Sequence, residues 1–249
     1  AHVAAVPGAD WQSVSREFVE HLGLTWNPLT TQIESHDWQS ELYADIARFN
    51  RVLHNLCTDI WTYISLGYFA QVRGQGTVGS STMPHKVNPI RFENAEANLE
   101  VSNALLDVLA STLVQSRLQR DLTDSSMQRN IGVALGHSLL AMDNVGRGLA
   151  GLDAAPEAMA ADLDANWEVL GEPIQSAMRA LGAQGVPGME EPYERLKELT
   201  RGRRIGQPEL VEFIHALGLP ADVEARLAAM TPQSYVGLAP QLVAHLKDA

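Results

Sequence analysis

Three long stretches of helical periodicity constrain the fold of this chain more than any other feature. Along the first, apolar or small residues recur at alternating intervals of four and three, at Leu42, Ile46, Phe49, Leu53, Leu56, Ile60, Tyr63 and Gly67. This spacing places them on one seam of an α-helix, as in a coiled coil. Comparable apolar runs follow in residues 89–113 and 131–152. The sequence therefore predicts three helices of roughly 25–35 residues, where the usual mean is about 11–12.

Seams of this length cannot all be buried within one small chain, so we expect a helical bundle shared between subunits. After residue 150 the predicted helices shorten, because proline and glycine interrupt residues 170–192 and 217–220. The fold class predicted is all-α. It comprises a long-helix bundle in residues 1–150, with a polar loop at about 73–89, and a smaller helical domain in residues 151–249, in which Trp167 is expected to pack.

Composition narrows the class of protein. A single cysteine, Cys57, excludes a disulfide scaffold and a thiolate metal site and favours a reducing compartment. The formal charge of −12 argues against nucleic acid as a partner, so an anion site would need a local concentration of cations. No apolar run of membrane-spanning length and no signal-peptide pattern occurs. We expect a cytoplasmic protein without a bound metal.

Residues 79–89 read Gly-Ser-Ser-Thr-Met-Pro-His-Lys-Val-Asn-Pro. Glycines at positions 74, 76 and 79 allow positive φ, whereas Pro84 and Pro89 fix φ and interrupt regular structure. A mobile approach followed by a stiff turn that carries hydroxyl and ammonium groups is typical of a closing active-site loop. The alternative is a polar surface loop. Pro89 is also expected at the first position of the second long helix, with Asn88 as its N-cap.

This string resembles the signature loop of the fumarase/aspartase superfamily, Gly-Ser-Ser-x-Met-Pro-x-Lys-x-Asn-Pro, and every fixed position is met. The form Pro-His-Lys-Val-Asn-Pro is similar to that of the adenylosuccinate lyase family, especially its longer bacterial type. Residues 30–34 (Thr-Thr-Gln-Ile-Glu) resemble the substrate-binding segment of that family. Residues 119–125 (Gln-Arg-Asp-Leu-Thr-Asp-Ser) resemble its nucleotide-phosphate segment.

The resemblance implies roles for the loop residues. Ser80 corresponds to the general base, although a serine needs activation for this role; a simple turn hydroxyl is the alternative. Lys86 and Asn88 correspond to the residues that hold the carboxylates of the succinyl group. The other loop residues implied to line the site are Ser81, Thr82 and Met83.

The resemblance also implies a phosphate-binding cluster of three residues, Arg120, Ser125 and Arg129. Two guanidinium groups and a hydroxyl suit a phosphate dianion. The alternative is that the arginines form ion pairs with Asp121 or Asp124.

Gln32 resembles a substrate hydrogen-bonding residue, and a turn role is the alternative. Glu93 matches a carboxylate that orients the catalytic acid, or it is an exposed helix carboxylate. His36, His54 and His137 are expected to be ordinary polar or core histidines.

The resembled enzymes eliminate fumarate from adenylosuccinate to give AMP and cleave a succinyl-carboxamide ribotide in purine synthesis. They need no cofactor, bind a nucleotide substrate and form homotetramers. Members of the family are nearly twice as long as this chain, and the half without a counterpart here carries the general-acid histidine. We therefore expect these 249 residues alone to be inactive. The alternatives are another superfamily lyase, such as an argininosuccinate lyase, and a catalytically silent oligomerising fragment.

Overall fold

The computed structural model describes residues 1–71, 88–118, 122–200 and 205–247. The described residues are mostly helical, as predicted, and their strands are β1 (Phe69–Gln71) and β2 (Leu152–Ala154), which pair with each other. Contacts divide the chain into two units. The first unit contains residues 1–66 and 71–153, and the second contains residues 67–70 and 154–249. Among the described helices, none combines the length and the apolar character that crossing a membrane requires.

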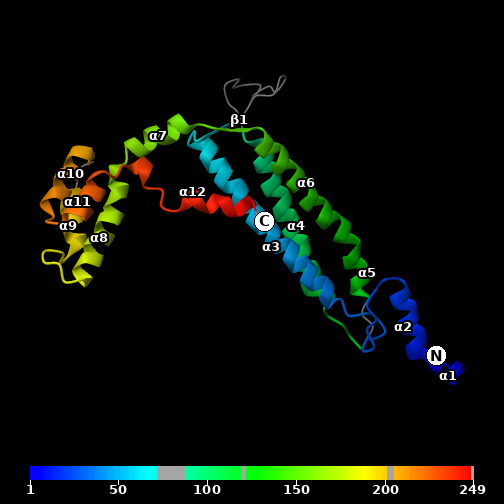
Figure 1. The fold of residues 1–249 in the computed structure, drawn as a ribbon. Helices are drawn as coiled ribbons and strands as arrows, with labels where there is room; N and C mark the ends of the chain where they lie inside the picture. The colour runs from blue at the N-terminus through cyan, green and yellow to red at the C-terminus, as the bar shows by residue number, and fades with distance from the viewer. Residues whose placement is uncertain (72–87, 119–121, 201–204, 248–249) are drawn as a thin grey trace. The chain divides into compact units, whose positions relative to one another are not determined.

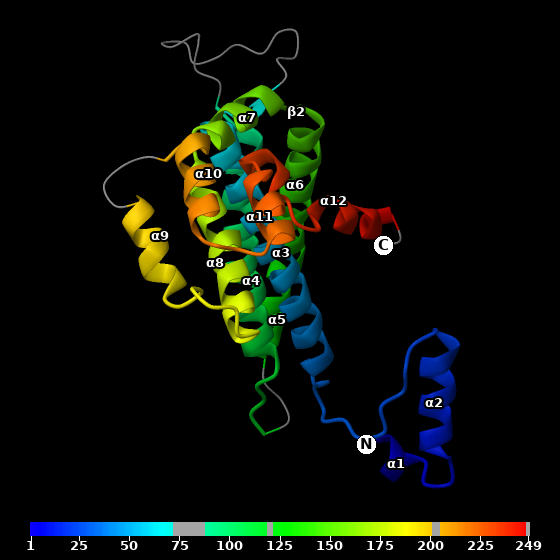
Figure 2. The same cartoon turned by 60° about the vertical axis from the view of Figure 1, so that its left-hand side comes forward.

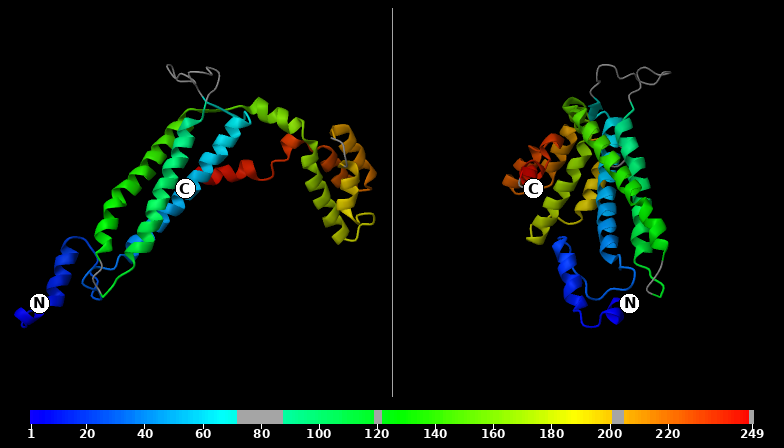
Figure 3. Two further views of the ribbon diagram at one scale, coloured as in Figure 1. Left: turned by 180° about the vertical axis from the view of Figure 1, so that it is seen from behind. Right: turned by 90° about the vertical axis from the view of Figure 1, so that its right-hand side faces the viewer.

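The body of the first unit consists of α3 (Asp37–Ser65), α4 (Ile90–Leu113) and α6 (Ile131–Ala150). α4 packs against both α3 and α6 (Figures 1 and 3). α3, with 29 residues, has the predicted length, whereas α4 and α6 are shorter, with 24 and 20 residues. The short elements of this unit are α1 (His2–Ala5), α2 (Trp11–His21), α5 (Thr123–Met127) and the 3₁₀ helix η1 (Gln128–Asn130).

α4 buries one continuous seam. Its buried residues step alternately by three and four and are Phe92, Ala95, Leu99, Ser102, Leu106, Leu109 and Leu113. This confirms the apolar run predicted for the helix. Its first residue is Ile90 and its N-cap is Pro89, one position later than predicted, because ψ of Pro89 is 52° and therefore not helical. Asn88 is not the cap residue.

α3 buries a face that overlaps the predicted seam only in part, since Ile60 is buried and Ile46 packs against the core. Its buried residues are Tyr43, Ala47, Asn50, Cys57 and Ile60. Four residues of the predicted seam are instead exposed by 38–51%, namely Leu42, Phe49, Leu56 and Tyr63. The face that packs in this unit is therefore displaced from the apolar maximum and is made largely of small and polar side chains.

A buried hydrogen-bond network connects the three long helices. The amide of Asn50 donates to Ser102 Oγ at 3.1 Å and accepts from Ser138 Oγ at 2.7 Å. Ser102 Oγ in turn donates to the Ala134 carbonyl at 2.8 Å. Asn50 and Ser102 are fully buried and Ser138 is 2% exposed. Because each buried polar group has a partner, the network fixes the register of α3, α4 and α6.

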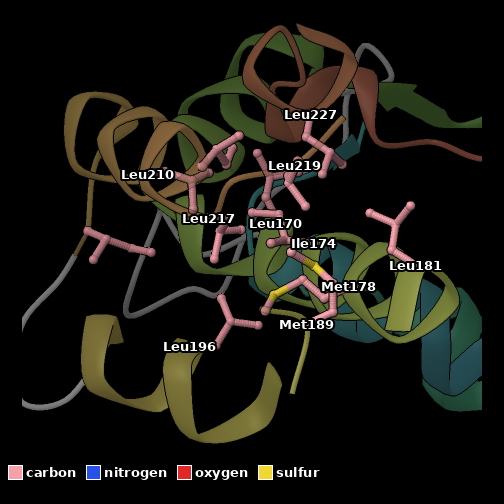
Figure 4. Packing of buried hydrophobic residues seen from close by; sticks show 12 residues of the cluster. Leu170, Ile174, Met178, Leu181, Met189, Leu196, Leu210, Leu217, Leu219 and Leu227 are labelled. Atoms are coloured by element: carbon pink, nitrogen blue, oxygen red, sulfur yellow. The ribbon is translucent and has the colours of Figure 1, made fainter. Parts of the chain in front are cut away.

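The second unit contains shorter helices around its own core (Figures 1 and 2). Figure 4 shows Leu170, Ile174 and Met178 in this cluster, and Trp167 packs against it, as predicted. The elements after β2 are α7 (Pro156–Asp164), η2 (Trp167–Leu170), α8 (Gly171–Ala183), α9 (Pro192–Thr200), α10 (Gln207–Ala216), α11 (Ala221–Ala228), η3 (Pro232–Ser234), α12 (Ala239–Leu242) and η4 (Val243–Lys247).

Candidate functional site

The predicted site residues fall into two groups with respect to the structure. Those outside the described residues are Ser80, Ser81, Thr82, Met83, Lys86 and Arg120. Those among the described residues are Gln32, Asn88, Glu93, Ser125 and Arg129. The geometry below concerns the second group, whose members all lie in the first unit.

Asn88 and Glu93 lie at the start of α4. Asn88 is exposed and directly precedes the N-cap, Pro89. Glu93 is partly buried in the first turn, and its Oε1 accepts a hydrogen bond from Trp61 Nε1 on α3 at 3.2 Å. The alternative of a merely exposed carboxylate does not describe Glu93, since Trp61 of α3 contacts it; its proposed role in orienting an acid stays a prediction.

Glu93 belongs to a row of carboxylates along the face of α4 that meets α3. One turn on, Glu96 Oε1 accepts from Thr58 Oγ1 at 2.6 Å, and Glu100 lies 3.5 Å from His54 Nε2. Among these contacts, the hydrogen bond from Trp61 is the one that orients Glu93.

Ser125 and Arg129 lie on α5 and the following η1. Both side chains are exposed, and Ser125 Oγ donates to the Leu122 carbonyl at 3.2 Å. Asp124 Oδ1 accepts from the Ser125 backbone N–H at 2.6 Å and forms no ion pair with Arg129. Within the described part of the chain no carboxylate forms an ion pair with Arg129, while Asp121, the other partner considered, lies outside the described residues.

A contact that the sequence did not predict joins two of the motif segments. Gln128, next to Arg129, has its Nε2 3.0 Å from Nε2 of His36, which follows the Gln32 segment. His36 is only 8% exposed, in agreement with its expected role as an ordinary buried polar histidine. The chain just after the Gln32 segment therefore contacts the chain next to Arg129, and Gln32 itself is exposed. Ninety-two positions separate the two residues, and nothing local in the sequence indicates their contact.

The two described parts of the predicted site lie at opposite ends of the bundle. Met127 of α5 packs against Leu109 and Leu113 near the end of α4, whereas Asn88 and Glu93 lie at its start (Figure 1). With 24 residues in α4, the two ends are about 36 Å apart. A single small ligand cannot contact both groups within one chain. Among the described residues no cluster of His, Cys, Asp or Glu is arranged to hold a metal ion.

Comparisons with known proteins bear on both halves of the chain. Residues 5–102 match a family model described as "Lyase", and residues 116–236 match one described as "Adenylosuccinate lyase C-terminal". The adenylosuccinate lyase of Escherichia coli K12 is 51% identical over 247 residues, which cover 99% of this chain and 53% of that protein. The chain belongs to the adenylosuccinate lyase family.

Other relatives agree with this assignment. The adenylosuccinate lyases of Vibrio cholerae and Haemophilus influenzae are 51% and 47% identical and cover 97% and 99% of this chain. The chain spans about half the length of these relatives, 52% and 53% respectively. A solved structure of 3-carboxy-cis,cis-muconate lactonizing enzyme from Pseudomonas putida has a TM-score of 0.66 and 21% identity, covering 97% of this chain and 54% of that one. This likeness supports the helical-bundle fold of the family.

Proposed function

We propose that the protein is an adenylosuccinate lyase that eliminates fumarate from adenylosuccinate, giving AMP, and cleaves the succinyl-carboxamide ribotide of purine biosynthesis. The observation that carries the proposal is 51% identity to a curated adenylosuccinate lyase over 99% of the chain. The uninterrupted signature string in residues 79–89 supports it. The absence of a carboxylate partner for Arg129 among the described residues favours a phosphorylated substrate over that of an argininosuccinate lyase.

The reaction breaks one C–H and one C–N bond. Ser80 removes the proton from the carbon next to a succinyl carboxylate, the electron pair forms the double bond of fumarate, and the amine leaves with a proton from a general acid. Lys86 and Asn88 bind the carboxylates as negative charge develops. Arg120, Ser125 and Arg129 bind the nucleotide phosphate, Gln32 contributes a hydrogen bond, and Glu93 orients the acid. Ser81, Thr82 and Met83 line the same site.

We also propose that the active enzyme is a cytoplasmic homotetramer in which different copies complete each site. The placement of Glu93 and Arg129 toward opposite ends of α4, a helix about 36 Å long, supports this, because no substrate of this class spans that distance. The exposed apolar residues of α3 support it further, since Leu42, Phe49 and Leu56 are 48%, 51% and 38% exposed. An apolar stripe of this kind is typical of a subunit interface.

The test uses the protein expressed from the complete reading frame that encodes this chain. Ser80→Ala is expected to abolish fumarate release while the affinity for AMP changes little, because the base acts on proton transfer and not on phosphate binding. Fumarate release is followed by ultraviolet absorbance and AMP affinity by inhibition or calorimetry. Near-normal turnover of Ser80→Ala would show that another group is the base.

Arg129→Ala tests the phosphate assignment separately. We expect the inhibition constant of AMP to rise by about 10-fold or more, the loss of a charge-assisted hydrogen-bonded pair, while that of fumarate changes little. Arg226→Ala is the matched control, because Arg226 is also an exposed helical arginine but lies in the second unit. Equal weakening of both ligands by Arg129→Ala would mean that this arginine is structural.

A further inference from the structure

A pocket of about 430 Å³ lies in the first unit, where the start of α4 meets the end of α6. None of the nine residues that line it is acidic. Two are arginines, Arg91 and Arg147, and three are amides, Gln71, Asn94 and Asn144. In a chain with 30 acidic and 18 basic residues, this composition is a local excess of positive charge.

The Arg91 guanidinium is held in place by a neutral group. Its Nη1 donates to Asn144 Oδ1 at 3.0 Å. The orientation of that amide is fixed, because Asn144 Nδ2 donates to Asn94 Oδ1 at 3.0 Å and to the Leu140 carbonyl at 2.9 Å. Asn144 is 6% exposed. An amide acceptor positions the guanidinium without neutralising it, and among the described residues Arg91 has no carboxylate partner. Its charge and remaining N–H donors are therefore available.

Two further donors complete the arrangement. Arg147 contacts Asp143 through Nε, at 3.1 Å from Oδ1 and 3.0 Å from Oδ2, and Asp143 does not line the pocket. This contact leaves the terminal nitrogens of Arg147 for other acceptors. Gln71 Nε2 is buried and has no hydrogen-bond partner in the described part of the chain. A buried donor without a partner is unfavourable, and an acceptor atom in the pocket would remove that cost.

We propose that this pocket binds a small oxyanion, a carboxylate or a phosphate, between Arg91 and Arg147 with Gln71 as a third donor. Guanidinium groups bind such oxygens through paired hydrogen bonds. The volume lies in the usual range for small-molecule sites, about 300–1,000 Å³. The pocket is separate from the proposed phosphate residues, because Arg129 lies at the other end of α4.

The position of the pocket in the sequence gives it a relation to the signature string. Gln71 and Ile90 both line the pocket, and they flank residues 72–89 on either side. A bound anion would thus contact both flanks of the segment that carries Ser80 and Lys86. The site itself does not depend on the proposed lyase activity, since binding is measured directly and without turnover.

The experiment measures binding of inorganic phosphate and, separately, of succinate by calorimetry at constant ionic strength. The protein is expressed from the complete reading frame and carries Arg129→Ala, which is expected to weaken phosphate binding at the other site. We expect saturable binding of at least one anion. Binding should weaken at least fivefold in Arg91→Gln and in Arg147→Gln, and it should be partly kept in Arg91→Lys, which retains the charge.

Arg226→Gln is the control and should bind the anion as tightly as the Arg129→Ala parent. Saturation by phosphate alone that weakens in Arg91→Gln identifies a phosphate ligand of this pocket, and saturation by succinate alone that weakens in Arg91→Gln identifies a dicarboxylate. Crystals soaked in selenate should show an anomalous peak between Arg91 and Arg147, which also covers the case of a variant that folds poorly. The proposal is overturned if neither anion saturates, if the arginine variants bind as tightly as Arg226→Gln, or if the selenate peak lies elsewhere.

Discussion

Gly148 is the position in the bundle where a single methyl group has the most predictable consequence. It lies on α6 against the ring of Phe92 on α4. A Cβ built on Gly148 would be 2.7 Å from Phe92 Cζ, 3.0 Å from Cε2 and 3.1 Å from Cε1. These contacts are shorter than the separation of about 3.5–4.0 Å that carbon atoms prefer. Phe92 is 1% exposed, so its ring cannot turn into solvent to relieve them.

Gly148→Ala combines two effects of opposite sign. Overpacking a dense core typically costs about 1–3 kcal/mol. Replacing glycine by alanine within a helix contributes about 0.8–1.0 kcal/mol of stability. With a contact of 2.7 Å, we expect the clash to exceed the helix gain and to lower the free energy of unfolding by up to about 2 kcal/mol.

Gly146→Ala is the matched control. Gly146 lies two residues earlier on the same helix, and no atom lies within 4 Å of a Cβ built there. The helix gain is common to both variants, so the difference between their stabilities isolates the clash, about 1–3 kcal/mol.

The assay is urea unfolding followed by tryptophan fluorescence, with the slope compared between variants to confirm that the unfolding reaction is unchanged. The reasoning would be refuted if Gly148→Ala were as stable as Gly146→Ala.

Two other predictions follow from buried polar groups. Asn50→Ala should lower the free energy of unfolding by about 1–3 kcal/mol, because Ser138 and Ser102 then lose their hydrogen bonds to Asn50. A double-mutant cycle with Ser138→Ala, measured by urea unfolding, should give a coupling free energy of about 0.5–3 kcal/mol. Burial, with a smaller contribution from the charge of Glu96, raises the pKa of the Cys57 thiol to about 11. The folded thiol should therefore not react with a disulfide reagent near neutral pH, and it should react fully in denaturant. Since the folded pKa lies above the unfolded value of about 8.5, the stabilisation is complete below that value and is lost as the pH rises through about 11. The free energy of unfolding, measured across this pH range for the unaltered protein and for Cys57→Ala, checks the sign of this effect. Equal pH dependence of the two proteins would contradict it.

Periodicity was sufficient to predict the helices but not their contacts. The α4 seam was recognisable because its buried positions, such as Leu99, Leu106 and Leu109, are large and apolar. The strands β1 and β2 were not predicted, because three residues each are too few to show an alternating pattern.

The motifs in the sequence supplied candidate site residues but not their arrangement. Short strings identify Ser80 or Arg129 as candidates, but they carry no information about which end of a helix meets which neighbour. The approach of His36 to Gln128, and the separation of Glu93 from Arg129, depend on how α3, α4 and α5 pack. The Arg91 pocket was missed for the same reason: Arg91 and Asn144 are 53 residues apart and belong to no common motif.

The partly displaced face of α3 explains why the periodicity predicted the helix but only part of its contact with α4. The face toward α4 is narrow and specific, since Ala47 allows close approach and Asn50 supplies the hydrogen bonds that set the register. The other face of α3 carries the stronger hydrophobic repeat. Its members, which lie seven residues apart and are exposed in this chain, are Leu42, Phe49, Leu56 and Tyr63. Each Å² of such surface that is covered contributes about 25 cal/mol. The exposed heptad residues of α3 are therefore the surface assigned to the proposed subunit contact, whereas the polar network holds α3 to α4 and α6.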